Sequence, residues 1–125
     1  RDRQIAKDIN KGKLINANVI PPDIPNIFYA PAARVFHLDQ NYPNPFNPEA
    51  MIRFGIPRPE RVQLRVYDVA GRLVRTLVDE PRNAGTYVEV WNGTDDRGRA
   101  VASGIYFYKL EAGTFRQVRK MTMLK

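Results

Sequence analysis

The sequence predicts an all-β protein whose residues 35–125 form an antiparallel β-sandwich of about seven short strands. Three observations lead to this expectation. Short runs rich in β-branched and aromatic residues follow one another from residue 35 onward. Turn-forming Gly, Pro, Asn and Asp residues separate these runs. No convincing helical spacing of apolar residues appears in this part of the chain.

The expected strands are short and follow one another closely. They cover residues 50–56, 61–69, 72–78, 86–91, 105–112 and 115–124. Turn sequences lie between them at residues 57–59, 70–71, 83–85, 92–93, 96–98 and 112–113. Close spacing without crossover helices favours two packed antiparallel sheets over a parallel sheet.

Side-chain alternation indicates which faces are buried. Val62, Leu64 and Val66 alternate with more polar residues, so their strand should have one buried and one solvated face. The run at residues 105–110 has large side chains on both faces and is expected to be a central strand. Trp91 is expected in the core, because a single Trp in a sandwich is usually buried.

The chain divides into an N-terminal arm or linker, residues 1–34, and one domain, residues 35–125. Two isoleucines four residues apart indicate a possible short helix at the start of the arm. Nine of the ten prolines lie within residues 21–59 and make the rest of the arm extended. Because the chain begins at Arg1 rather than Met, we expect a fragment or a processed product.

Apolar residues in the arm indicate that it docks on a surface. They are Leu14, Ile15, Val19, Ile20, Ile27, Phe28 and Tyr29. A segment that stays in solvent has little reason to keep so many apolar side chains. Two outcomes remain open. The arm docks on its own sandwich, or it adds as a strand to an edge of a neighbouring copy, which produces an open filament unless the rotation closes a ring.

The chain is basic, with a formal net charge of +7. The basic residues are spread over many strands, so nucleic-acid binding is an unfavoured alternative, while an anionic partner stays open. The absence of cysteine fits a cytosolic protein or a secreted one without disulfides. No apolar run reaches the roughly 20 residues that a membrane span requires.

Catalytic and cofactor-binding motifs are not found in the sequence. The only His is His37 and the only Ser is Ser103, and neither has the neighbours of a nucleophilic site. A transition-metal site lacks His and Cys ligands, and no glycine-rich phosphate loop is present. We therefore expect a protein that is not an enzyme, with no cofactor, no metal and no small-molecule substrate.

One acidic cluster allows two interpretations. Asp95 and Asp96 precede Gly98, and carboxylates in a glycine-containing loop can bind calcium. Two adjacent carboxylates without a following bidentate Glu supply few ligands, however. A hairpin turn, with Asp accepting backbone N–H groups and Gly98 at positive φ, is therefore the favoured interpretation.

A further set of features is more specific than the strand pattern. It begins with Asn41, Tyr42, Pro43, Asn44, Pro45, Phe46, Asn47 and Pro48. We expect the prolines to make this segment rigid, and Tyr42 and Phe46 to pin it on the sandwich. Further motifs follow at residues 67–72, 91–93, 95–98, 103–108 and 120–125. In this order and spacing they resemble the C-terminal sorting domain of cargo exported by the type IX (Por) secretion system. That family is similar in turn to the immunoglobulin-like domain of the flagellar hook-capping protein.

The resemblance covers residues 35–125 and implies an immunoglobulin-like sandwich at the end of a larger secreted protein. Such domains are recognised by outer-membrane export machinery, and some are cleaved at the cell surface while the cargo becomes attached there. The matching positions are Gly71, Trp91, Gly93, Gly98 and Gly104, together with the tail residues Lys120, Met121, Leu124 and Lys125. Glu89 is a departure, because the family often has an apolar residue at that position.

Three functions remain open at this point. The first is a non-catalytic sorting and surface-anchoring module whose partner is the outer-membrane secretion or surface-attachment machinery. The second is a structural subunit of an extracellular filament or surface assembly, whose partners are copies of itself joined through the arm. A third function, closer to the flagellar relative, is a scaffold that directs the assembly of other subunits. Each implies a secreted, cell-surface or extracellular protein.

Overall fold

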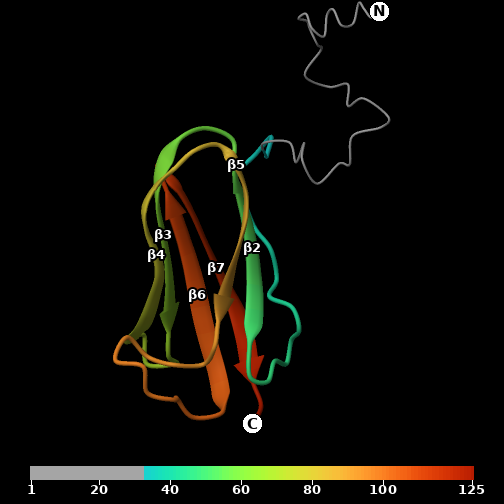
Figure 1. The fold of residues 1–125 in the computed structure, drawn as a ribbon, viewed down its shortest axis with the longest axis vertical. Coiled ribbons are helices and arrows are strands. Elements are labelled where there is room, and N and C mark those ends of the chain that lie inside the picture. The colour runs from blue at the N-terminus through green and yellow to red at the C-terminus, as the bar shows by residue number, and fades with distance from the viewer. Residues whose placement is uncertain (1–32) are drawn as a thin grey trace, which may run out of the picture. The chain divides into compact units, whose positions relative to one another are not determined.

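A computed structural model describes residues 33–125, so nearly all of the predicted arm lies outside the described part. Within these residues every element of regular secondary structure is a β-strand, and there are seven strands (Figure 1). They are β1 (His37–Leu38), β2 (Ala50–Ile56), β3 (Glu60–Tyr67), β4 (Leu73–Arg82), β5 (Gly85–Trp91), β6 (Gly104–Ala112) and β7 (Phe115–Met123). The chain crosses between the two layers three times, after β2, β4 and β5, as expected for an immunoglobulin-like sandwich.

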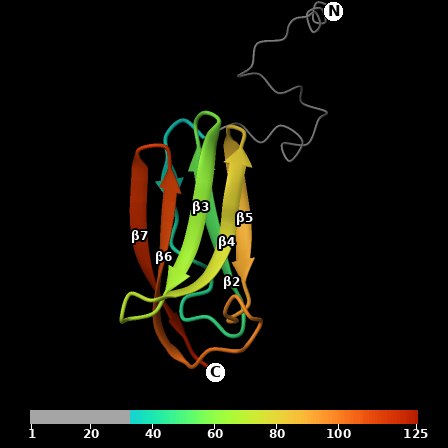
Figure 2. The same cartoon turned by 90° about the vertical axis from the view of Figure 1, so that its left-hand side faces the viewer.

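The strands form two antiparallel sheets that pack face to face. One sheet has the order β1-β2-β5 and the other the order β4-β3-β6-β7. Figure 2 shows the four-stranded sheet in front, with β3 and β6 between the edge strands β4 and β7. The prediction that residues 105–110 belong to a central strand is therefore confirmed.

The core lies between the two sheets and consists of inward-facing residues from every strand. Val62, Leu64 and Val66 are fully buried, while the residues between them on β3 are partly exposed, which confirms the predicted alternation. Trp91 is also fully buried, and its ring meets the ring of Tyr106 edge to face, with centroids 5.2 Å apart. Apolar burial of this kind is the main force that holds two sheets together.

Two strand boundaries differ by more than one residue from those predicted, and the short strand β1 was not predicted. The strand expected over residues 61–69 ends at Tyr67, because Asp68 already begins a turn. The strand expected to end at residue 78 continues through Pro81 to Arg82. Proline lacks a backbone N–H and usually ends a strand, but β4 is an edge strand with one side free of a partner strand, where proline is tolerated.

Candidate recognition site

The proline-containing segment, residues 41–48, runs beside the last strand of the protein. The N–H of Phe46 donates to the C=O of Thr122 at 2.9 Å, and the N–H of Leu124 donates to the C=O of Phe46 at 3.0 Å. The side chain of Asn44 accepts a further bond from the N–H of Thr122 at 3.1 Å. These bonds join the predicted motif to the predicted tail, although they lie far apart in the sequence.

Asn41 fixes the start of the segment. It is a buried polar residue, 3% exposed. Its Nδ2 donates to the C=O of Pro43 at 2.7 Å, and its Oδ1 accepts from Gln40 Nε2 at 2.6 Å. Gln40 Nε2 also donates to the C=O of Lys120 at 2.8 Å. A buried amide needs such partners, so the polar atoms of Asn41 hold the segment in one conformation against β7.

The two aromatic residues of the segment differ in their placement. Phe46 is 1% exposed, and its ring centroid lies 5.6 Å from that of Trp91. Tyr42 was also expected to pin the segment on the sandwich, and that expectation is wrong, because its side chain is 71% exposed. The backbone of Tyr42 pairs with Met51 through two hydrogen bonds of 2.9 and 2.8 Å. The backbone therefore supplies the contact expected of the ring.

The predicted tail residues divide into an inward and an outward set. Met121 is fully buried in the core. Lys120, Leu124 and Lys125 are exposed. The backbone N–H of Lys125 donates to Oγ of Ser103 at 3.1 Å, which fastens the last residue to the loop before β6. The end of the chain is thus held in place while three of its side chains remain accessible.

Gly93 brings the end of β5 to the same site. A Cβ added at Gly93 would lie 3.1 Å from Met123 Sδ and 3.6 Å from the C=O of Pro48. Its φ of 77° is one that other residues rarely adopt. Glycine is therefore required where the loop after β5 touches both the proline-containing segment and the last strand.

Two turns share one five-residue pattern that the sequence analysis missed, Asp-x-x-Gly-Arg at residues 68–72 and 95–99. In each turn Oδ1 of the Asp accepts the N–H groups of the residues two and four positions later, all at 2.9 Å. Each Gly has a positive φ, 83° at Gly71 and 81° at Gly98. Gly104 also has a positive φ and precedes the body of β6. The favoured interpretation of Asp95 as a turn residue is confirmed, and the repeated spacing of Asp, Gly and Arg was the signal available in the sequence.

Hydrogen bonds control the protonation of these carboxyl groups. The backbone N–H of Arg72 holds the pKa of Asp68 below its usual value, and the backbone N–H of Arg99 does the same for the pKa of Asp95.

In the core, burial raises the pKa of Tyr108 to about 12. Its hydroxyl donates to the C=O of Asp39 at 2.6 Å. This hydrogen bond joins β6 to the residue that follows β1.

The residues with possible chemical roles all have structural partners. His37 lies in β1 and bonds Asp39 Oδ1 through Nδ1 at 2.8 Å. Within residues 33–125, no group of three or more His, Cys, Asp or Glu side chains is placed to hold a metal ion. The described residues also contain no helix long and apolar enough to cross a membrane. The apolar arm residues from Leu14 to Tyr29 lie outside the described part, so strand addition through them stays a prediction.

Comparison with known proteins identifies a matching family and a similar solved structure. A family model described as the FlgD Ig-like domain matches residues 46–114, which is more than half of the chain. No curated protein matches the chain. Among solved structures the chain is similar to PorZ, described as an essential bacterial surface component of the type-IX secretion system of Porphyromonas gingivalis. The sequence identity is 18% and the TM-score 0.48, and the match covers 72% of this chain and 11% of PorZ.

Proposed function

Because the chain belongs to the family of FlgD Ig-like domains, we propose that it is a non-catalytic C-terminal sorting domain. In this proposal it directs export of a secreted protein through type IX-type machinery in the outer membrane and anchors that protein at the cell surface. The ordered motifs, from the segment at residues 41–48 to the tail at residues 120–125, support the proposal. In order and spacing they resemble the motifs of the sorting family.

The observation that carries the proposal is the pairing of these two segments. The N–H of Phe46 donates to Thr122, and the C=O of Phe46 accepts from Leu124. The exposed tail residues therefore form one surface with the folded proline-containing segment. A receptor that reads this surface would accept the domain only after the proline-containing segment and β7 have come together. Export of a folded domain with a defined C-terminal surface needs such a feature.

The exposure of the tail residues separates recognition from stability. Lys120, Leu124 and Lys125 are accessible to a receptor, while Met121 contributes to the core. Substitution of the exposed residues should therefore affect export without unfolding the domain. Substitution of Met121 by Ala should instead destabilise it by about 2–5 kcal/mol, as for other buried methionines.

The experiment fuses the full chain to the C-terminus of a reporter in a host with type IX machinery. The variant Lys120→Glu/Leu124→Ser/Lys125→Glu should leave the melting temperature nearly unchanged and abolish display of the reporter on the cell surface. The matched control is Arg116→Glu/Val118→Ser, which changes exposed residues elsewhere on β7 and should leave display intact. Normal display of the triple variant would contradict a recognition role for the tail.

A further inference from the structure

Three of the four sheet edges of the sandwich are either covered over part of their length or too short to pair with another strand. On β4, the C=O of Val74 accepts the N–H of Asp96 at 3.0 Å, and Oδ1 of Asp96 accepts the N–H of Thr76 at 3.0 Å. Pro81 lies near the other end of the same strand and offers no N–H. These features prevent an additional strand from pairing along β4.

The edges at β7 and β1 are covered in other ways. The last residues of β7 bond the proline-containing segment through Phe46 and Asn44. Next to them, Nε2 of Gln40 donates to the C=O of Lys120 at 2.8 Å. β1 is only two residues long, too short to act as a template for another strand.

The fourth edge, β5, has no backbone partner on its outer side among residues 33–125. β5 pairs with β2 alone, and none of its backbone groups bonds any other described residue. On β2, Met51 and Arg53 bond towards the β1 side, to Tyr42 and Asp39. Because an antiparallel ladder alternates, the even-numbered residues of β2 bond β5. Their partners are the odd-numbered residues of β5, such as Glu89 opposite Ile52.

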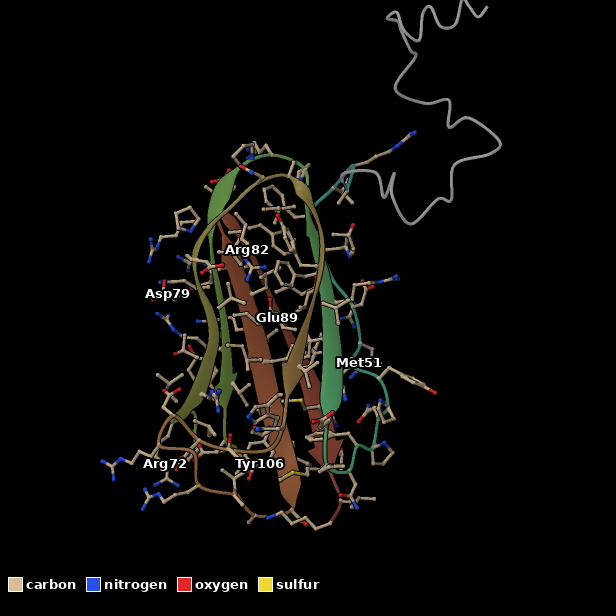
Figure 3. All side chains as sticks on the ribbon, viewed as in Figure 1. Met51, Arg72, Asp79, Arg82, Glu89 and Tyr106 are labelled. Carbon is tan, nitrogen blue, oxygen red and sulfur yellow. The ribbon has the colours of Figure 1, made fainter. Side chains whose placement is uncertain are left out.

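The outward backbone groups of β5 therefore belong to Thr86, Val88 and Val90. All three side chains are exposed on the outer face of the sheet, Val88 by 53% and Val90 by 47%. Within β5 the only charged residue is Glu89. Glu89 does not guard the edge, because its carboxylate bonds Arg82 of β4 at 3.0 Å on the inner side of the sheet (Figure 3).

We propose that β5 pairs with β5 of a second copy, so that two three-stranded sheets join into one continuous sheet of a symmetric dimer. The outward residues are spaced evenly about Val88, so a two-fold axis there satisfies all of them at once. Val88 pairs with Val88 of the partner subunit, and Thr86 pairs with Val90 of the partner subunit. Each pair exchanges both of its backbone hydrogen bonds.

Charge selects this register over its neighbour. With the axis at Val88, each Glu89 lies opposite Tyr87 of the partner subunit. With the axis at Glu89, two carboxylates would lie opposite each other, which is unfavourable. On the outer face, the dimer places Val88 beside its symmetry mate and Thr86 beside Val90 of the partner subunit. Pairs of β-branched residues stabilise such a ladder.

The test of the register uses the absence of cysteine from the chain. Opposite residues of a hydrogen-bonded pair have Cα atoms about 5.5 Å apart. Val88→Cys in the full chain should therefore form a cross-linked dimer in high yield with a short bismaleimide reagent. Two Val90→Cys residues would lie about 14 Å apart along the strands and should cross-link poorly. Val118→Cys, equally exposed on the opposite sheet, should not cross-link above background.

The test of the contact uses sedimentation of the full chain over a concentration series. The unmodified chain should dimerise, and Val88→Pro should remain monomeric with an unchanged circular dichroism spectrum, because it removes an outward N–H and no bond to β2. Val88→Lys is a second variant that keeps the backbone intact and should also remain monomeric. The control Val118→Lys should dimerise like the unmodified chain. A chain that stays monomeric throughout, or a dimer that survives both Val88 variants, would overturn the proposal.

Discussion

Asp68 and Asp95 contribute to the acid sensitivity of the fold, together with Asp39 and Asp79, whose pKa values are also lowered. Backbone N–H groups hold the pKa of Asp68 and of Asp95 below the ordinary value of 3.8, so each ionised carboxylate stabilises the folded state above that pH. This stability is lost as the pH falls through the lower pKa of the folded state. Chemical unfolding between pH 2 and pH 5 should show a steep loss of stability below about pH 4.

The variant Asp68→Ala/Asp95→Ala should show a shallower dependence of the unfolding free energy on pH over the same range. The slope is the informative quantity, because loss of the turns lowers stability at every pH. Glu49→Ala, which removes an exposed carboxyl outside the turns, serves as the control. Equal slopes in the unmodified protein and the double variant would show that these hydrogen bonds do not contribute to the pH dependence of the unfolding free energy.

The two aromatic residues of the proline-containing segment should differ in their effect on stability. Phe46→Ala removes a buried ring that contacts Trp91 and should cost about 3–5 kcal/mol of unfolding free energy. Tyr42→Ala removes an exposed ring and should change it by less than about 0.5 kcal/mol. Urea unfolding of both variants measures the difference, and similar losses would contradict the placement of the two rings.

At the level of strands, local sequence patterns predicted which side chains of a strand are buried and which strand is central. The alternation in β3, the central position of β6 and the burial of Trp91 all follow from side-chain period and size. The extension of β4 through Pro81 depends on its place at a sheet edge, which local patterns do not reveal. The pairing of residues 44–46 with β7 depends in the same way on long-range packing. The burial of Phe46 could be anticipated, while the exposure of Tyr42 could not.

Glu89, the departure from the family pattern, is explained by a partner on the other sheet. Arg82 of β4 bonds its carboxylate at 3.0 Å and also lies over the ring of Tyr87, 4.7 Å from its centroid. Figure 3 shows Arg82 and Glu89 on facing strands of the two sheets. The pair therefore joins β4 to β5 on the side where the sandwich is open.

A double-mutant cycle should measure this link. Glu89→Leu and Arg82→Met should each destabilise the protein, because each removes the ion pair between the two sheets. Arg82→Met also leaves the partly buried Glu89 without this partner, whereas Arg82 keeps Glu80 when Glu89 is replaced. The double variant should be more stable than the sum of the single effects implies, by about 1 kcal/mol. A coupling free energy near zero would show that the two residues act independently.

At the level of the whole molecule, the described residues have their own core and a complete set of turns. A fragment comprising residues 35–125 should therefore fold alone, with a far-UV circular dichroism spectrum typical of β-sheet. A disordered or helical spectrum at neutral pH would contradict this expectation.

The melting temperature of this fragment should be equal with chelator and with excess calcium, because Oδ1 of Asp95 already accepts two backbone N–H groups.

The arm prediction is tested by comparing the full chain with the same fragment. Light scattering and electron microscopy over a concentration series would detect filaments. Fibres that form from the full chain and not from the fragment would favour a structural subunit over a sorting domain. A symmetric dimer through β5 closes on itself, so dimers alone do not indicate a filament.

If this domain directs a protein to type IX export, surface display of a fused reporter must depend on the type IX machinery. A reporter with a signal peptide at its N-terminus and the full chain at its C-terminus is produced in two strains, one with intact type IX machinery and one with that machinery inactivated. Surface-exposed reporter is then quantified by protease accessibility on whole cells. The account predicts surface display in the intact strain and periplasmic retention in the inactivated strain. Equal display in both strains, or retention in both with a folded domain, would contradict it.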